Sequence, residues 1–248
     1  MTMSENKWLV NFRPNPEAHM RLFCFPYAGG NANIYRNWGD LLTPEIEVVG
    51  IQLPGHGTRI KEIAFTRLPP TIRALLASIQ PVLNRPFALF GHSLGALLAY
   101  HLALELTSLH ISPEILFVSA SKAPKQQATN GIHSLDDAVF VNQIKELNGT
   151  PEAIFASQEL LNMMIPILRA DFAMAETYAL EKKPLLDIPI VGMSGNRDVR
   201  NTQKDMAAWA NFTSGIFVNV SFPGDHFFIQ SQEAALTNII SEHTATIL

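Results

Sequence analysis

A buried strand that turns directly into a helix is the feature that most constrains how this chain can fold. Residues 87–90 are apolar and run into Gly91-His92-Ser93-Leu94-Gly95, and strong helix formers follow over 96–106. Glycine at 91 and 95 indicates that strand and helix nearly touch, leaving no room for a Cβ atom. The turn forces Ser93 into a strained conformation and holds its hydroxyl clear of both elements, which predicts a nucleophile. The alternative is a tight turn in which Ser93 only caps the helix.

The rest of the chain alternates between strand and helix patterns. Strands are predicted at 8–12, 20–25, 47–53, 114–120, 188–194 and 216–222, and helices at 33–42, 68–83, 203–212 and 233–247. This alternation predicts an α/β fold, with a mostly parallel sheet flanked by helices on both faces. The length of 248 residues and a hydrophobic content of 47% suit a single domain over residues 1–248.

The interval 124–184 differs because it contains no convincing strand pattern. Ser134 is predicted to be the N-cap of a helix that runs to Leu147. A second helix is predicted from Gln158 to Tyr178, bent or restarted at Pro166. Since this helical interval lies between two strands, we interpret it as a lid over the carboxyl edge of the sheet.

A serine hydroxyl needs a base, and His226 is the strongest of the eight histidines. It lies in a loop directly after the last predicted strand, so it is expected at the same sheet edge as Ser93. His56, in a glycine-rich loop, is the rival base. His92 adjoins the nucleophile but is expected to point away from it and to pack.

A carboxylate must orient the base and stabilise its charged form. Asp198 follows the penultimate predicted strand and completes the chain order serine, acid, histidine. The alternative for Asp198 is a solvated turn aspartate. Asp225 is too close in sequence to His226 to orient its ring, and Asp171 lies in the lid pattern.

Two backbone N–H groups are expected to stabilise the oxyanion of the tetrahedral intermediate. Leu94, at the start of the helix after the nucleophile, supplies one. The second is expected from the loop after strand 20–25, where Gly29 and Gly30 allow amides to face a ligand. Ala28 is the preferred donor and Tyr27 the alternative.

Composition and charge exclude several classes of function. A net charge of −4 with scattered signs gives no electrostatic footprint for nucleic acid. No apolar run approaches the length of a membrane span, and residues 1–7 lack the apolar core of a secretory signal. The single cysteine, Cys24, is interpreted as a small buried side chain in a reducing compartment. A soluble cytoplasmic protein is therefore expected.

With these residues in place, the chain resembles the type II thioesterases of non-ribosomal peptide and polyketide synthesis, a branch of the α/β-hydrolase fold. The resemblance extends over residues 22–228, beyond the motif around Ser93. The matching blocks are residues 25–30, 35–38, 52–59, 91–96, 168–172 with Tyr178, 195–198 and 224–227. One departure is His56, where arginine is expected more often.

The resemblance implies hydrolysis of acyl groups from the phosphopantetheine thiol of carrier proteins, which clears stalled or wrongly primed chains. It implies no metal and no resident cofactor, since the serine, the histidine and the oxyanion donors supply each step, and phosphopantetheine arrives on the partner. A monomer is expected. Carrier proteins are usually acidic, so a basic docking patch is expected, with Arg36, Arg59, Lys182 and Lys183 as candidates beside the default of a solvated surface.

The second lid helix has apolar residues at helical spacing, and ordinary packing explains most of them. Met163, Met164 and Phe172, with Tyr27 from the sheet edge, are the candidates to line a chamber for the acyl chain. Arg169 and Asp171 are interpreted as members of structural ion pairs.

Two other functions remain open at this stage. A general carboxylesterase, or a thioesterase that ends fatty-acid synthesis on its carrier, would use the same Ser93, Asp198 and His226. A protein of another class, a non-catalytic interaction module on a hydrolase scaffold, would have no need to keep all three in order.

Overall fold

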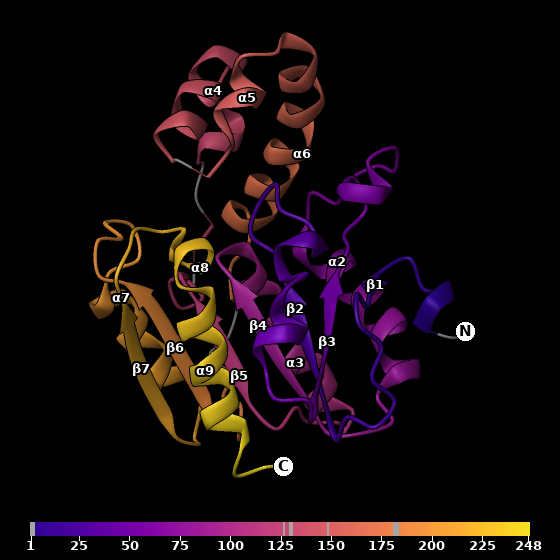
Figure 1. The fold of residues 1–248 in the computed structure, drawn as a ribbon. Helices are drawn as coiled ribbons and strands as arrows, with labels where there is room; N and C mark the ends of the chain where they lie inside the picture. The colour runs from indigo at the N-terminus through magenta and orange to yellow at the C-terminus, as the bar shows by residue number, and fades with distance from the viewer. Residues whose placement is uncertain (1–2, 126, 129–130, 148, 181–183) are drawn as a thin grey trace.

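A single sheet organises the molecule, in the strand order β1-β3-β2-β4-β5-β6-β7 (Figure 1). The computed structural model describes residues 3–248 except 126, 129–130, 148 and 181–183. β1 pairs antiparallel with β3, and every other neighbouring pair in this order is parallel. The strands are β1 Leu9–Val10, β2 Met20–Phe25, β3 Ile46–Ile51, β4 Phe87–His92, β5 Leu116–Ser119, β6 Ile190–Gly195 and β7 Phe217–Phe222. The predicted α/β fold with a mostly parallel sheet is confirmed.

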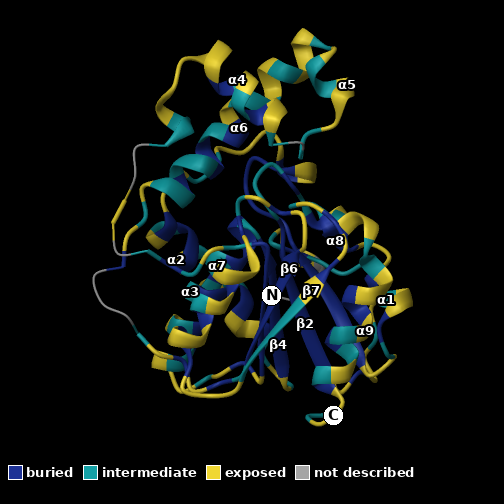
Figure 2. Ribbon diagram, turned by 90° about the vertical axis from the view of Figure 1, so that its left-hand side faces the viewer, coloured by how far each residue is buried: buried dark blue, intermediate teal, exposed yellow. Residues whose placement is uncertain are grey.

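Helices cover both faces of the sheet, which Figure 2 shows as a largely buried layer. One face packs against α2 (Leu68–Ile79), α3 (Leu94–Ser108) and α7 (Gln203–Ala207). The other packs against α1 (Trp38–Leu41), α8 (Phe228–Ser231) and α9 (Glu233–Thr244). Because side chains alternate along a strand, β4 sends Phe87 and Leu89 to the first face and Ala88 and Phe90 to the second.

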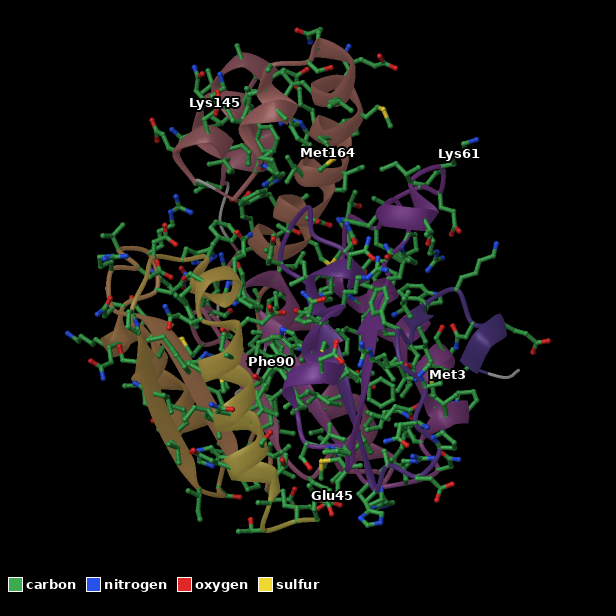
Figure 3. All side chains as sticks on the ribbon, in the orientation of Figure 1. Met3, Glu45, Lys61, Phe90, Lys145 and Met164 are labelled. Carbon is green, nitrogen blue, oxygen red and sulfur yellow. The ribbon has the colours of Figure 1, made fainter. Side chains whose placement is uncertain are left out.

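The lid is inserted in the sequence between β5 and β6 and lies over the carboxyl edge of the sheet (Figure 1). It consists of α4 (Asp137–Glu146), α5 (Glu152–Phe155) and α6 (Gln158–Glu176). A small core of its own holds it together, formed by Phe140, Ile144 and Leu168. Figure 3 shows Lys145 and Met164 in the lid and Glu45 at the opposite end of the molecule.

Local details of the lid differ from the sequence prediction. Ser134 is not the N-cap of α4: it belongs to a 3-10 turn, Ile132–Ser134, and Asp136 takes the N-cap position. α6 continues through Pro166 as one helix, capped by the Ser157 side chain. Pro166 removes one backbone hydrogen bond, but the next residues, Ile167 and Leu168, are buried and keep the helix packed.

Other elements also differ from the prediction. The helix expected at 33–42 divides into a 3-10 turn, Ala32–Tyr35, and α1, while α5 and α8 were not predicted. The helices expected at 68–83 and 203–212 end in 3-10 turns, Gln80–Val82 and Ala208–Phe212. None of the described helices combines the length and apolar character needed to cross a membrane.

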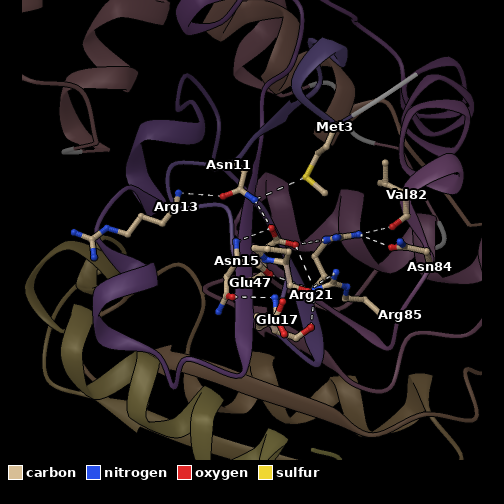
Figure 4. A network of polar contacts seen from close by, with 12 residues as sticks. Met3, Asn11, Arg13, Asn15, Glu17, Arg21, Glu47, Val82, Asn84 and Arg85 are labelled. Atoms are coloured by element: carbon tan, nitrogen blue, oxygen red, sulfur yellow. Dashed lines mark hydrogen bonds and ion pairs between the residues drawn. The ribbon is translucent and has the colours of Figure 1, made fainter.

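A buried ion pair stabilises the amino ends of β2 and β3, opposite the lid (Figure 4). Arg21 Nε donates to Glu47 Oε2 at 2.8 Å, and each residue is only 4% exposed. Glu47 Oε1 also accepts from the Asn11 side chain at 2.7 Å and from the Asn15 N–H at 3.1 Å. Since these partners satisfy both charges, the network ties the segment before β2 to the sheet.

Candidate active site

The backbone at Ser93 is strained, as the sequence predicted. Ser93 joins β4 to α3 with φ 56° and ψ −116°, a conformation that L-residues rarely adopt. The glycines on either side are required by space: a Cβ at Gly91 would overlap the carbonyl of Gly95, and one at Gly95 would overlap the carbonyl of Phe25. The turn therefore presents the Ser93 hydroxyl at the carboxyl edge of the sheet.

Ser93, His226 and Asp198 meet at this edge. Ser93 Oγ lies 3.1 Å from His226 Nε2, and His226 Nδ1 lies 2.8 Å from Asp198 Oδ2. The three residues follow β4, β7 and β6, whose carboxyl ends lie together because the strands are parallel. Asp198 accepts a hydrogen bond from Nδ1–H, so the proton stays on Nδ1 and Nε2 keeps a lone pair that faces the serine hydroxyl.

Asp198 is held as a carboxylate by more than His226. Its Oδ1 accepts the N–H groups of Arg200 at 2.9 Å and Asn201 at 3.1 Å. Burial alone would raise the pKa of Asp198, but the hydrogen bond and charge of His226, with these two N–H groups, lower the pKa below its usual value. Both oxygens are thereby fixed in place.

His92 packs beside the site and also anchors it. Its Nε2 lies 2.9 Å from the carbonyl oxygen of His226, which can only accept, so Nε2 carries the proton. Nδ1 then accepts from the Ser119 hydroxyl at 2.9 Å. Burial, followed by the nearby His226, lowers the pKa of His92 to about 3. The ring therefore stays neutral and holds the His226 backbone, a role that sequence reasoning missed.

Asn201 is a second residue that the sequence analysis did not single out. Its side-chain Nδ2 is placed 3.2 Å from His226 Nδ1, and its backbone N–H donates to Asp198 Oδ1. Because Nδ1 already carries a proton, it can only donate, so the amide oxygen is the group that suits this position. The sequence offers one indication of this role: Asn201 lies three residues after Asp198, where a turn can bring its backbone N–H back to the Asp198 carboxylate.

A cavity of about 190 Å³ adjoins Ser93 beneath the lid. α6 lines it with one helical face, formed by Leu168, Asp171, Phe172 and Ala175. The other lining residues are Tyr27, Ala28, Ser93, Leu94, Ile144, Leu147, Gly149, Thr150, Arg200, Asn201, His226 and Phe227. Tyr27 and Phe172 thus lie where the sequence prediction placed them.

The two methionines proposed for the acyl chamber lie elsewhere. Met163 is 47% exposed and borders a separate groove with Ile60 and Ile63, so its predicted place in the chamber is wrong. The reason is the helix period, since Met163 is turned away from the face that carries Leu168. Met164 borders a neighbouring cavity beside Gly29 rather than the one that contains Ser93.

The two predicted oxyanion donors both line the Ser93 cavity. Leu94 is the first residue of α3, where the N–H has no acceptor within the helix. The Ala28 N–H has no acceptor among the described residues. The Tyr27 carbonyl accepts the Gly30 N–H at 2.9 Å, which turns the loop around Gly29 at φ 75°. The N–H groups of Leu94 and Ala28 are therefore the candidate donors to the oxyanion.

The rival residues have other partners. His56 Nε2 lies 2.9 Å from Asp171, away from the Ser93 hydroxyl, so the structure does not place it as the base. Asp225 accepts the N–H of Phe227. Asp171 and Arg169 do form ion pairs, with His56 and with Asp137.

Of the proposed docking cations, Arg59 is unsuitable because it is 8% exposed and pairs with Glu62. Its guanidinium also lies 4.7 Å from the centre of the Trp8 ring. Arg36 is exposed. Lys182 and Lys183 lie outside the described residues.

A nucleophile on a strained strand-to-helix turn, with a histidine and a buried carboxylate from later strands, defines a serine hydrolase of the α/β-hydrolase fold. The model of the Thioesterase domain family matches residues 20–246. The chain belongs to this family and is a thioester hydrolase. In the part of the chain that the structure describes, no cluster of three His, Cys, Asp or Glu side chains is arranged to hold a metal ion.

Known proteins of similar length resemble the chain throughout. The gramicidin S biosynthesis protein GrsT of Aneurinibacillus migulanus is 36% identical over 98% of this chain and 96% of its own. The linear gramicidin dehydrogenase LgrE of Brevibacillus parabrevis is 40% identical over 96% and 92%. The solved structure of the type II thioesterase BorB from the borrelidin biosynthetic cluster has a TM-score of 0.86, with 36% identity over 95% and 97%.

Proposed function

We propose that this enzyme is an editing type II thioesterase that hydrolyses acyl groups from phosphopantetheinylated carrier proteins of a peptide or polyketide assembly line. The observation that carries the proposal is the hydrogen-bonded chain from Ser93 through His226 to Asp198, placed beneath a lid at the mouth of a cavity. Similarity to GrsT and BorB along the whole chain supports the substrate class.

In the first half-reaction, Ser93 Oγ attacks the thioester carbonyl while His226 Nε2 accepts its proton. The negative charge that develops on the carbonyl oxygen is stabilised by the N–H groups of Ala28 and Leu94. The C–S bond then breaks, and the departing sulfur takes the proton from His226. The products are an acyl-enzyme on Ser93 and the free pantetheine thiol.

In the second half-reaction, a water molecule attacks the acyl-enzyme and gives its proton to His226 Nε2. The bond to Ser93 Oγ breaks, the serine regains a proton from His226, and the carboxylic acid leaves. Asp198 remains ionised and stabilises the charged ring in both halves. Since these side chains supply every proton transfer, the proposal requires no resident metal or cofactor, and phosphopantetheine enters on the carrier protein.

The size of the cavity favours a substrate with a short acyl group. Its volume of about 190 Å³ is bounded by apolar side chains, including Leu94, Ile144 and Leu168, which suit a hydrocarbon chain better than a charged one. The proposal includes a monomer in the cytoplasm, a reducing compartment that accords with the free, buried Cys24.

The test offers the enzyme a panel of acyl-loaded carrier proteins and follows deacylation by intact-protein mass spectrometry. We expect wild type to release short acyl groups and Ser93→Ala to release none. A fluorophosphonate probe is expected to label wild type at Ser93 only. Labelled enzyme that ignores acyl-carriers but hydrolyses matched oxygen esters would identify a carboxylesterase. Unlabelled protein would indicate a non-catalytic module.

A further inference from the structure

The lid contacts the predicted oxyanion loop through one buried carboxylate. Asp171, on α6, is 1% exposed and accepts the Gly29 N–H on Oδ2 at 2.7 Å. The same oxygen lies 2.9 Å from His56 Nε2. Gly29 adjoins Ala28, and His56 belongs to the loop after β3, so Asp171 joins three separate segments of the chain.

The hydrogen bonds of His56 define its charge. Nδ1 lies 2.9 Å from the carbonyl oxygen of Pro54, and Nε2 lies 2.9 Å from the Asp171 carboxylate. Both partners are acceptors, and a neutral imidazole has only one N–H to donate. A ring that satisfies both contacts is therefore doubly protonated, and His56 and Asp171 form a buried ion pair.

The surroundings of His56 agree with this charge. Burial favours the neutral ring, but the charge and hydrogen bond of Asp171, with the Pro54 carbonyl, raise the pKa of His56 above its usual value. Arg59, on the adjacent 3-10 turn, opposes the charge and is itself paired with Glu62. Gln52, directly after β3, donates to the His56 carbonyl at 2.6 Å.

The pair is not arranged for stability alone. Asp171 Oδ1 is buried and has no hydrogen-bond partner among the described residues, which costs free energy. An ion pair selected only to hold the lid would satisfy this oxygen or be replaced by apolar residues at little loss. Asp171 also lies on the face of α6 that lines the Ser93 cavity.

We propose that Asp171 is a positioning residue: it holds the loop of residues 27–30 in its active geometry while α6 is docked and His56 is protonated. The bond to Gly29 N–H fixes the peptide plane between Ala28 and Gly29. This restricts rotation about Ala28 and so aims its N–H. Docking of the lid and formation of the oxyanion site are thereby coupled.

The test measures kcat and KM on a small activated ester, p-nitrophenyl butyrate, which keeps the result independent of the carrier-protein substrate. We expect Asp171→Asn to lower kcat by roughly 10- to 100-fold, since small misplacements of catalytic groups cost this much. KM is expected to stay within about twofold because the cavity keeps its shape. The matched control is Asp137→Asn, at a lid carboxylate whose side chain is 74% exposed.

The charge of His56 gives a second readout. Wild-type kcat is expected to fall at alkaline pH as His56 loses its proton, and His56→Arg, with a permanent charge, is expected to lack that fall. The ¹⁵N spectrum of the wild-type ring is expected to show imidazolium at pH 6. A neutral ring at that pH, or a kcat for Asp171→Asn within twofold of Asp137→Asn, overturns the proposal.

If Asp171→Asn does not fold, His56→Gln decides. Glutamine can still donate to Asp171 but carries no charge, so we expect a several-fold lower kcat at pH 7 and loss of the alkaline fall. A wild-type kcat and pH profile in His56→Gln overturns the proposal.

Discussion

Three histidines near the site differ in protonation because their partners differ. His226 has Nδ1–H directed at Asp198 and an unprotonated Nε2 that faces Ser93 Oγ, whereas His92 has Nε2–H directed at the His226 carbonyl. His56 faces an acceptor on each side. In the sequence the eight histidines are chemically identical. The contacts made in the folded chain decide which ring nitrogens of these three carry a proton.

The orientation of His226 by Asp198 leads to a prediction at the residue scale. Asp198→Asn keeps the shape but places an NH₂ or a neutral oxygen against Nδ1, which favours the wrong tautomer. We expect kcat/KM to fall by roughly 10⁴-fold, measured on an acyl thioester with a thiol-trapping dye. Asp225→Asn, a neighbouring change at a carboxylate that accepts the Phe227 N–H, is the control and should stay within about twofold. Equal losses in the two variants would contradict the role of Asp198.

At the scale of elements, α6 forms part of the wall of the Ser93 cavity. One face of this helix lines the Ser93 cavity, while Met163 lies outside it. Leu168, on the same face, lies so close to Gly29 that a Cβ atom added at position 29 would be 2.6 Å from the Leu168 side chain. The lid therefore sets both the size of the chamber and the position of the loop beneath it.

Phe172 is the residue of α6 whose truncation tests chamber size. Phe172→Ala removes a ring from the cavity wall, and we expect the ratio of kcat/KM for dodecanoyl to butanoyl thioesters to rise roughly 10-fold. Met163→Ala makes a similar truncation on the same helix outside the cavity and should leave the ratio unchanged. Competition between the two substrates, read by mass spectrometry, measures the ratio directly. An unchanged ratio in Phe172→Ala would contradict the prediction that the Phe172 ring limits chain length.

The sheet and its loop residues could be predicted because each depends on local pattern. An apolar run predicts a buried strand, and position after a strand places Ser93, Asp198 and His226 at one edge. The lid is harder to predict, because α6 continues through Pro166 where the residues that follow, Ile167 and Leu168, are buried by tertiary packing. The contact of Asp171 with His56 spans 115 positions and carries no local signal, and the neutral form of His92 depends on burial.

At the scale of the whole molecule, buried histidines make stability depend on pH. Burial lowers the pKa of His92 to about 3 and that of His101 to about 4, whereas both are near 6.5 in an unfolded chain. As pH falls below 6.5, these two histidines bind protons in the unfolded chain but stay neutral in the folded chain, so the free energy of unfolding decreases. The pKa of His56 is raised, so its contribution is present below 6.5 and is lost as pH rises.

His101 isolates this effect because it is not among the residues that line the Ser93 cavity, and its ring packs against those of Tyr100 and Tyr178. We expect His101→Phe to flatten the acid side of the stability curve. The slope of unfolding free energy against pH should decrease by up to about 1.4 kcal/mol per pH unit between pH 6 and 4.5. Urea titrations at several pH values measure this slope. The exposed His19, changed to Gln, should leave it unaltered, and an unchanged slope in His101→Phe would show that its pKa is not depressed.

The three side chains of the site follow three different strands, and Ser93 and His226 are 133 positions apart. No fragment that lacks β7 can hydrolyse a thioester, however well its remaining strands form. Turnover therefore reports that this edge of the sheet is complete: when a denatured sample is diluted into buffer, activity returns only once the loops after β4, β6 and β7 have come together.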